Sequence, residues 1–372
     1  MMTIKQRIES VYRGVVPDEV PYMLDLSHWY YHKEQLPWDL SKPYEEPEYD
    51  LIDLHKKHDV GFYMPNLGHF YDVINSDDVM SEMHKSSDGK KITWSLETPI
   101  GRIERTRVWE ETSYSWGIRD WGITTKEQLK IFASAMRNRK YRFLPEKYHA
   151  WINAIGDTGV CYVGAGYSAM GQLLNYWMGV EGAIVASCEW PDEMWEVIDE
   201  VNQNNLLLID MLASSPVEYV VMGDNFSSDV QPSYFFDQWS RSYYTEAIKR
   251  IHKAGKFVAV HIDGRLKGAI RMIRETGADC ADAVTPTPMG DLTPQECRDE
   301  AGNDYILSGG VSPDLWLPGV PLEVFKKAAL DWVELKKQSP RLIANAGDQV
   351  PPGAEEKRID IMRDLVTKYG KY

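Results

Sequence analysis

From residue 146 onward, short apolar runs alternate with longer segments of helical periodicity. The runs are rich in β-branched residues and too short for helices, so they predict strands buried on both faces. The predicted strands are residues 160–164, 219–222, 257–260, 281–284, 305–307 and 342–344. The predicted helices are residues 145–156, 173–180, 191–214, 235–254, 266–276, 294–301, 322–337 and 355–369. Regular alternation of strand and helix is typical of a parallel sheet covered by helices.

The first part of the chain is less regular. Helices are predicted at residues 3–12, 51–58 and 125–137, the first and third with threonine N-caps. Residues 16–26, VPDEVPYMLDL, predict a turn followed by a short strand, and residues 60–64 predict the next strand. A long loop is predicted from residue 27 to 47, with room for one helical turn. Residues 93–109 alternate polar and apolar side chains around Pro99 and Gly101, which indicates an inserted β-hairpin. With the early strands, about eight strands predict an α/β fold of the (β/α)8 TIM-barrel type. We expect one domain over residues 1–372, with the loop and hairpin insertion at about 27–120.

Polar residues follow several of the predicted strands. Asp224 and Asn225 follow one strand, His261 and Asp263 follow the next, and Asp348 follows the last. In a barrel these positions share the face that carries catalysis. The alternative is that each aspartate only caps the following helix, and for a single residue a cap is the commoner role. Carboxylates at several strand ends together favour a common site.

Crowded carboxylates repel one another, so a cation is expected among them. It could be a metal ion, an arginine or a shared proton. Histidine with aspartate oxygens suits zinc or a harder divalent ion such as Mn²⁺ or Fe²⁺. Asp224, His261 and Asp263 are the candidate catalytic groups. The competing interpretation is a metal-free site in which a protonated His261 pairs with Asp263.

Aromatic residues suggest where a substrate would lie. The chain has 21 Tyr and 13 Trp against 9 Phe, which favours amphipathic pockets. Trp29, Tyr30 and Tyr31 follow the first predicted strand, and either line an apolar substrate pocket or fold over the barrel as a plug. Further candidates for substrate contact are Tyr167, Asn225 and Arg265.

Composition narrows the class of protein. The chain is 43% hydrophobic and 26% charged, as expected of a globular protein, and its net charge of −15 disfavours nucleic acid and anionic membranes as partners. The N-terminus lacks a signal-peptide pattern and no window resembles a membrane span, so a cytoplasmic location is expected. Four cysteines without a CxxC pair predict no disulfide framework.

An ordered set of motifs resembles the uroporphyrinogen decarboxylase superfamily. The motifs are IKQRIESVYRGVVPDEVPYML, ETPIGRI, TTKEQLKIF, MGDNF, AGKFVAVHIDG, ETGADCADAV, ILSGGVSP and GDQVPPGAEE. The resemblance covers nearly the whole chain and implies a (β/α)8 barrel. Two activities dominate the superfamily: metal-free decarboxylation of uroporphyrinogen, and methyl transfer involving corrinoid proteins or coenzyme thiols.

The resemblance also separates these two branches. Uroporphyrinogen decarboxylases carry an arginine-rich segment after the first strand, whereas here that segment is LDLSHWYYHKE, without arginine. Thiol-using methyltransferases of the superfamily bind zinc through His-x-Cys and a later Cys. The matching positions are His261, Asp263 and Asp348, so carboxylates replace both thiolates. The resemblance therefore implies a harder three-ligand site for a divalent ion, with zinc as the first candidate.

Together these observations predict a methyltransferase. It would move a methyl group from a small donor, with a phenyl methyl ether as one candidate, to cobalamin carried by a partner corrinoid protein. One alternative is a metal-free lyase of the decarboxylase type that uses Asp224 and His261 as acid and base. Another is a non-catalytic protein that binds a tetrapyrrole or a corrinoid. Oligomeric state stays open.

Overall fold

The computed structural model describes residues 1–36, 38–40, 46–65 and 70–372. Its centre is a six-stranded sheet in the order β12-β11-β10-β9-β8-β7, with every neighbouring pair parallel. The strands are β7 (Tyr162–Gly164), β8 (Tyr219–Phe226), β9 (Phe257–Ile262), β10 (Cys280–Val284), β11 (Ile306–Gly310) and β12 (Leu342–Asn345). Each of the six predicted strands of this region is present. The alternation of strand and helix read from the sequence is thereby confirmed.

Two short segments close this sheet into a barrel. Tyr22 forms a parallel bridge with Ala344 of β12, and Met23 forms one with Gly61. The second segment continues the closure, because Phe62 bridges Gly159 immediately before β7. A Cβ atom at Gly159 would lie 1.8 Å from the Phe62 carbonyl oxygen, so the close approach of the two backbones requires glycine there. With these two segments the fold is the predicted eight-stranded (β/α)8 barrel.

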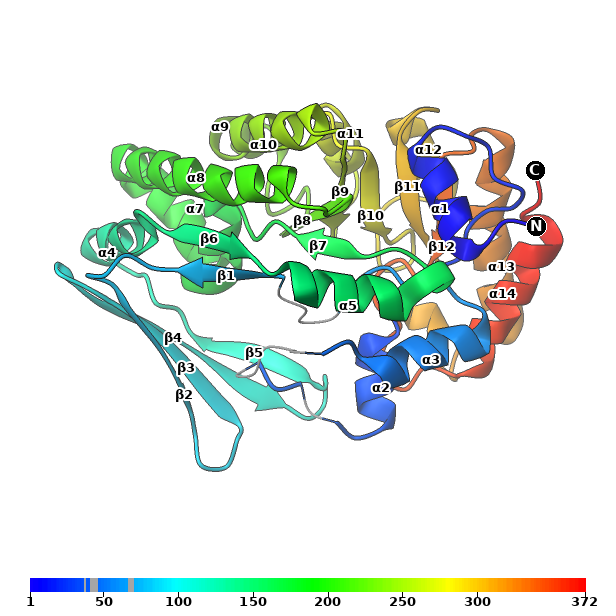
Figure 1. Cartoon of the computed structure of the whole chain (residues 1–372), viewed down its shortest axis with the longest axis horizontal. Helices are drawn as coiled ribbons and strands as arrows, with labels where there is room; N and C mark the ends of the chain where they lie inside the picture. Colours follow the sequence, from blue (N-terminus) through cyan, green and yellow to red (C-terminus); the bar gives the residue numbers. More distant parts are fainter. Residues whose placement is uncertain (37, 41–45, 66–69) are drawn as a thin grey trace.

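Helices surround the barrel and differ from the predictions mainly at their ends (Figure 1). They are α1 (Ile4–Tyr12), α2 (Ser27–Lys33), α3 (Tyr49–His58), α4 (Lys126–Met136), α5 (Pro145–Ile155), α6 (Ala169–Gln172), α7 (Gly179–Glu189), α8 (Pro191–Ser214), α9 (Ser233–Trp239), α10 (Arg241–Lys253), α11 (Ala269–Arg274), α12 (Pro294–Ala301), α13 (Leu322–Val333) and α14 (Lys357–Tyr369). The threonine caps are confirmed: Thr3 and Thr125 each form a capping box. None of the helices in the described part of the chain is long and apolar enough to cross a membrane.

Three predicted helical or loop segments need correction. The helix predicted at residues 235–254 is two helices, because the buried Ser240 leaves helical geometry and donates its hydroxyl to Gln231. The segment predicted at 173–180 is a π-helical turn, Leu173–Trp177, followed by α7, which starts at Gly179 with φ +74°. The loop predicted at 27–47, for which one helical turn was expected, begins with the seven-residue helix α2, whose first turn is held by Asp25. That carboxylate accepts hydrogen bonds from the Ser27 amide and hydroxyl. Residues 37 and 41–45 of this loop lie outside the described part of the chain.

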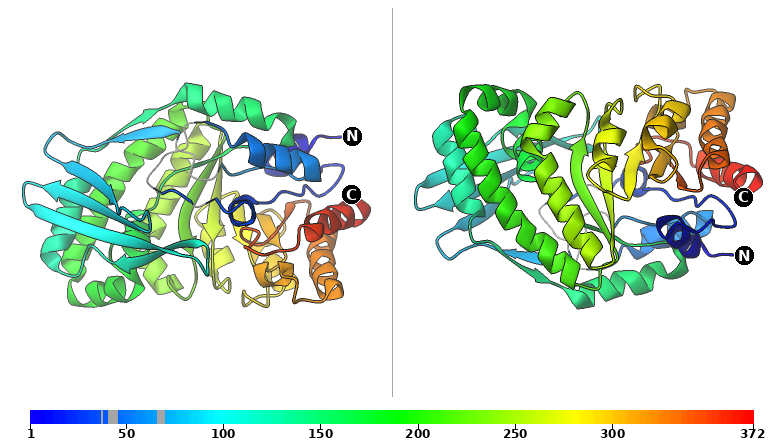
Figure 2. Two further views of the ribbon diagram at one scale, coloured as in Figure 1. Left: turned by 90° about the horizontal axis from the view of Figure 1, so that it is seen from below. Right: turned by 90° about the horizontal axis from the view of Figure 1, so that it is seen from above.

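The insertion is larger than the predicted hairpin. β3 (Lys91–Thr98) and β4 (Gly101–Glu110) form that hairpin, and β2 (Met80–Lys85) and β5 (Ser115–Asp120) extend it to four antiparallel strands. β1 (Tyr71–Ile74) and β6 (Lys140–Phe143) form a separate antiparallel pair. β2 was missed because nearly all of its residues are exposed, so it lacks the apolar alternation of a half-buried strand. Figures 1 and 2 show this cyan sheet extending away from the barrel.

A separate apolar cluster fixes the inserted sheet to the rest of the molecule. Leu96 of β3 and Ile103 of β4 pack with residues of α4, π-helical Trp177 and the N-terminal half of α8. This cluster is distinct from the larger core between the barrel and its helices. The sheet is therefore packed in place, and its inner face lies against the segment that follows β7.

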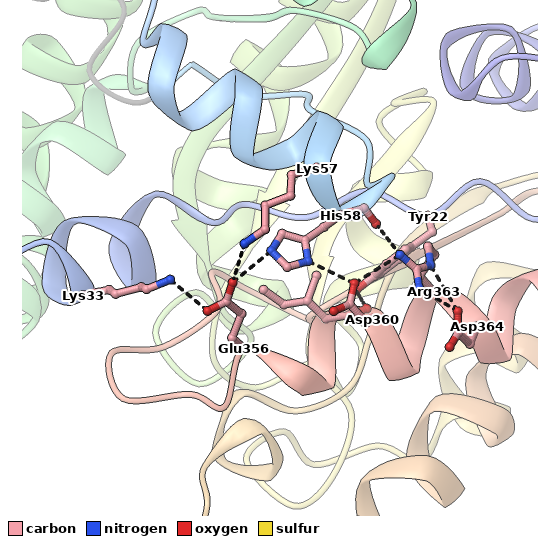
Figure 3. A network of polar contacts seen from close by, with 9 residues as sticks. Tyr22, Lys33, Lys57, His58, Glu356, Asp360, Arg363 and Asp364 are labelled. Atoms are coloured by element: carbon pink, nitrogen blue, oxygen red, sulfur yellow. Dashed lines mark hydrogen bonds and ion pairs between the residues drawn. The ribbon is translucent and has the colours of Figure 1, made fainter.

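An ionic network attaches the C-terminal helix to the N-terminal half of the chain (Figure 3). The carboxylate of Glu356 accepts hydrogen bonds from Lys33, at 2.8 Å, and from Lys57, at 3.0 Å. His58 contacts both Glu356 and Asp360, at 3.2 and 3.0 Å. The hydrogen bonds from Lys33 and Lys57 lower the pKa of Glu356 to about 2. The network holds α14 against α2 and α3, next to the segments that close the barrel.

Glu356→Gln should destabilise the protein modestly. Since 35% of the Glu356 side chain is exposed, screening limits the loss to on the order of 1 kcal/mol, which is about 1 to 2 °C in Tm for a chain of this size. Because the pKa of Glu356 in the folded protein lies below the ordinary value of 4.5, its stabilising contribution should be complete above pH 4.5. The difference in Tm between parent and variant should therefore shrink as pH falls toward 2. Thermal melts across this pH range measure both effects. Glu323→Gln, which removes an exposed pair with Lys326, is the control and should change Tm less. Equal Tm for parent and Glu356→Gln at neutral pH would contradict the account.

Candidate active site

A cavity of about 440 Å³ opens at the C-terminal ends of the barrel strands. Its size suits a small molecule. The described residues that line it are Asp25, Trp38, Met64, Gly164, Gly166, Tyr167, Val221, Gly223, Asn225, His261, Asp263, Asp348 and Gln349. They come from six of the eight barrel strands or the loops after them, as expected for the catalytic face of this fold. We call this space the His261 cavity.

A chain of buried polar contacts orients His261. Its Nδ1 lies 3.4 Å from Oδ2 of Asp282, the residue opposite it on β10. Asp282 is fully buried, and its other oxygen accepts a hydrogen bond from Ser308 on β11. Asn345 on β12 donates to Ser308 in turn. This series of contacts runs across four neighbouring strands, β9 to β12. It leaves Nε2 of His261 facing the cavity, 3.9 Å from Oδ1 of Asp348.

The carboxylates determine the protonation of this pair. Burial alone would lower the pKa of His261, but the hydrogen bond to Asp282 and the charges of Asp348, Asp282 and Asp263 raise it to about 9. The Asp348 side chain keeps 38% exposure to the cavity, yet its carboxyl lies deep among protein atoms. Burial and the negative charge of Asp263 raise its pKa to about 6, although His261 opposes the shift. The pair is therefore an imidazolium beside an acidic group that takes up a proton near neutrality.

Negative charge exceeds positive charge in the His261 cavity. Asp25, Asp263 and Asp348 line it, and no lysine or arginine lies among the described residues of its wall. Asp25 is engaged with Ser27 and Gln349, which leaves Asp348 beside His261 and Asp263 on the exposed part of the wall. In the described ranges, no three His, Cys, Asp or Glu side chains converge closely enough to share a metal ion. His261 and Asp348 fit as two ligands, whereas Asp263 is exposed and would have to turn inward.

The structure separates the predicted catalytic residues. His261 and Asp263 line the cavity, but Asp224 does not. Asp224 is 1% exposed and accepts hydrogen bonds from the backbone amide and the hydroxyl of Ser168, at the start of α6. Burial raises its pKa. Asp224 does not cap the following helix, as the alternative expected, but holds Ser168, the N-cap residue of the earlier helix α6.

The predicted substrate contacts are divided as well. Tyr167 and Asn225 line the cavity, whereas Arg265 is exposed outside it and contacts Ser227 and Ser228 through its backbone. Trp29 is 3% exposed and donates its indole N–H to the Ala354 carbonyl, and Tyr31 donates to Glu48. Tyr30 stacks edge-on against Tyr31. Among the described aromatic residues between the first strand and α3, Trp38 is the one that lines the cavity.

Three polar residues of the site carried no clear signal in the sequence. Asp282 lies inside the buried run of β10, where an acidic residue is rare unless it has a partner. Its position in the strand opposite His261 could have indicated a partner for that histidine. Asp25 and Gln349 contact each other at 2.8 Å, although they come from opposite ends of the chain. Only closure of the barrel brings them together.

The first test concerns the charge of His261. In metal-free protein, NMR titration should give a pKa near 9 for His261, and Asp282→Asn should lower it by about 1 to 2 units because one neighbouring charge is lost. Since the folded pKa exceeds the free value of 6.5, ionised His261 stabilises the fold below pH 6.5, and this contribution fades as pH rises toward 9. His252, paired with Asp279 on the surface, is an internal control that should not shift. A His261 pKa at or below 6.5 in the parent would contradict the account.

Comparison with known proteins agrees with this architecture. Residues 160–369 match the family model for uroporphyrinogen decarboxylase (URO-D). A structure described as a methyltransferase from Methanosarcina mazei is similar with a TM-score of 0.63 and 12% identity, covering 99% of each chain. At that identity the likeness shows the fold alone. D-psicose 3-epimerase from Clostridium cellulolyticum H10 is more distant, with a TM-score of 0.36, 11% identity and coverage of 61% of this chain and 85% of its own.

No curated protein matches the chain in sequence. The family match covers more than half of the chain, including β8 to β12 and with them His261, Asp282 and Asp348. The closed barrel and the position of the His261 cavity at its strand ends are consistent with that match. This chain belongs to the uroporphyrinogen decarboxylase (URO-D) family.

Proposed function

We propose that the protein is a methyltransferase that passes a methyl group from a small methylated donor to the cobalamin of a partner corrinoid protein. The observation that carries this proposal is the wall of the His261 cavity, which holds three carboxylates and, among its described residues, no lysine or arginine. Uroporphyrinogen carries eight carboxylate arms, and an acidic wall repels such a ligand. Of the two main activities in the superfamily, methyl transfer fits this wall and decarboxylation of uroporphyrinogen does not.

The residues of the cavity suit cleavage of a methyl ether. The C–O bond would break with its electron pair left on oxygen, while the methyl carbon is taken up by the partner's corrinoid and the oxygen receives a proton. In the metal-free form of the site, His261 and Asp348 both face the cavity and can hold that proton. Asp282, Ser308 and Asn345 would keep the imidazole in place during the transfer. Trp38 and Tyr167 provide aromatic surface for the rest of the donor.

A divalent metal ion forms part of the proposal. His261 and Asp348 would hold it, with Asp263 turned inward as the third ligand, and zinc is the first candidate. Asp282 would then be the carboxylate that orients the metal-bound imidazole, a common arrangement around such histidines. The ion would supply Lewis-acid polarisation of the ether oxygen. The surplus of negative charge in the cavity supports a cation there.

Activity assays test the reaction class. Purified protein mixed with a reduced corrinoid protein and an aryl methyl ether should release the phenol, and it should not convert uroporphyrinogen. His261→Gln and Asp348→Asn should lower methyl transfer by on the order of 100-fold or more, because each removes a group that would hold either the metal ion or, in a metal-free site, the transferred proton. His252→Gln is the matched control, since it removes a surface histidine–aspartate pair and should leave the rate unchanged. Uroporphyrinogen decarboxylation that depends on His261 would reverse the assignment.

Elemental analysis tests the metal separately. The parent and His252→Ala should each carry about one zinc per chain, and His261→Ala and Asp348→Ala should carry much less, because each loses a ligand. Chelation should abolish methyl transfer and added zinc should restore it. A parent protein that contains no metal and transfers methyl groups in the presence of chelator would exclude the metal from the mechanism.

A further inference from the structure

A second cavity adjoins the His261 cavity, between the inserted sheet and the barrel. It measures about 300 Å³ and shares Gly166 and Tyr167 with the His261 cavity. Six aromatic rings line it, together with Arg105 of β4 and with Arg139. The aromatic residues are Tyr71, Trp94, Tyr141, Tyr167, Tyr176 and Trp177. We call this space the arginine cavity.

Arg105 lies among aromatic rings and forms no ion pair with an acidic residue of the described part of the chain. Its guanidinium carbon is 4.4 Å from the centre of the Trp94 ring and 4.8 Å from that of Tyr176. The Nε atom is buried without a hydrogen-bond partner in the described part of the structure. Burial and the charge of Arg107 lower the pKa of Arg105 to about 10, so the side chain is cationic at neutral pH. Arg107 packs on the same Tyr176 ring, with its guanidinium carbon 5.2 Å from the ring centre, and its Nε is also unpartnered among these residues.

Arg139 adds a second cation to the wall. Its Nε donates to the side-chain oxygen of Asn75 at 2.9 Å, and burial lowers its pKa. No aspartate or glutamate occurs among the described residues that line the arginine cavity. By contrast Arg102, on the same strand as Arg105, lies within 4 Å of three carboxylates, those of Glu82, Glu97 and Glu104.

Unpaired cations of this kind are costly in a protein with a surplus of acids. The chain has 56 acidic residues against 41 Lys and Arg, so neutralising partners are plentiful in the sequence. Half-buried arginines without a carboxylate are destabilising until an anion binds. A guanidinium pairs best with a planar carboxylate through two parallel hydrogen bonds, and the surrounding rings favour an aromatic group. The wall of the arginine cavity therefore fits an aromatic acid.

Tyr167 stands where the two cavities meet. Its backbone carbonyl accepts hydrogen bonds from the amide groups of Gln172 and Asn205, each at 3.2 Å. Its ring packs edge-on against Tyr176, with the ring centres 4.8 Å apart. A ligand that fills both cavities would pass this ring, with one end beside Arg105 and the other beside His261.

We propose that the arginine cavity binds the carboxylate of a small aromatic acid whose methyl-bearing group extends past Tyr167 into the His261 cavity. The role of this acid as methyl donor rests on the proposed function. Binding of the acid itself rests only on the arginine cavity. The acidic wall around His261 repels the carboxylate, and the two arginines attract it, so the charges orient the ligand in one direction.

Calorimetric titration tests the binding site without turnover. The probes are para- and meta-methoxybenzoate, the matching neutral methoxybenzamides, and inorganic phosphate. At least one methoxybenzoate should bind the parent on the order of 10-fold more tightly than its amide and than phosphate. Arg105→Met and Arg139→Met should each weaken its binding by about 10- to 100-fold, because each removes a charged hydrogen-bond donor. Arg105→Lys keeps the positive charge but not the planar guanidinium, so it should weaken methoxybenzoate binding less than Arg105→Met does.

Arg102→Met is the matched control, on the same strand but paired with surface carboxylates, and should bind as the parent does. Melting curves show whether each variant is folded, and Arg139→Met carries the test if the tightly packed Arg105→Met does not fold. Equal binding of acid and amide, no binding of either methoxybenzoate, or unchanged affinity in the folded arginine variants would overturn the proposal. If phosphate binds as tightly as the methoxybenzoate, the claim that the arginine cavity selects an aromatic acid would be wrong.

The same variants separate this site from the proposed function. Arginine-dependent binding of a methoxybenzoate that is never demethylated would leave the site in place and remove the methyl-transfer assignment. Demethylation of neutral ethers and methoxybenzoates alike, at rates unaffected by Arg105→Met and Arg139→Met, would retain methyl transfer and overturn the site.

Discussion

Closure of the barrel is the constraint on which the rest of this structure depends. The β7–β12 sheet would be open without the bridges from Tyr22 to Ala344, from Met23 to Gly61 and from Phe62 to Gly159. These bridges unite both ends of the chain, and they bring Asp25 from the first segment beside Gln349 after the last strand. Because all strands run in parallel, their polar C-terminal ends surround one opening. The ionic network of Glu356 and the bridge between Glu19 and Lys371 hold the terminal segments around the closure.

Within that opening, charge is divided between two adjoining spaces. The His261 cavity has an acidic wall with one imidazole, which the buried Asp282 orients from behind. The arginine cavity has cations among aromatic rings and is completed by the inserted sheet. Electrostatic forces act strongly in such partly dehydrated spaces, so the two walls favour opposite ends of a ligand. The barrel supplies the reacting groups in this account, and the insertion supplies the selectivity, because Arg105 and Trp94 both belong to the inserted sheet.

Sequence patterns were sufficient for the barrel and insufficient for much of the site. The strands at β8 to β12 were readable because buried parallel strands are continuous apolar runs, and His261 and Asp348 were found because polar residues interrupt such runs at the strand ends. Asp224 shows the limit of that reasoning, since it was predicted to follow a strand but lies inside β8 and bonds Ser168 away from the cavity. The contribution of Asp282 and the grouping of Arg105 with Arg139 depend on contacts between distant segments. A pattern along one chain does not show which residues will be opposite each other on neighbouring strands. The exposed strand β2 was not predicted for a different reason: it buries almost no apolar surface, so its sequence shows no apolar alternation.

The central claim is that one methyl donor spans both cavities, with its methyl group beside His261 and its anionic end beside the arginines. A crystal structure of the protein with a bound methoxybenzoate tests this most directly. The account predicts that the methoxy carbon lies in the His261 cavity near Asp348, that the ring passes Tyr167, and that the carboxylate pairs with Arg105 or Arg139. A carboxylate bound at His261 instead, or a ligand that leaves both arginines without a contact, would contradict it.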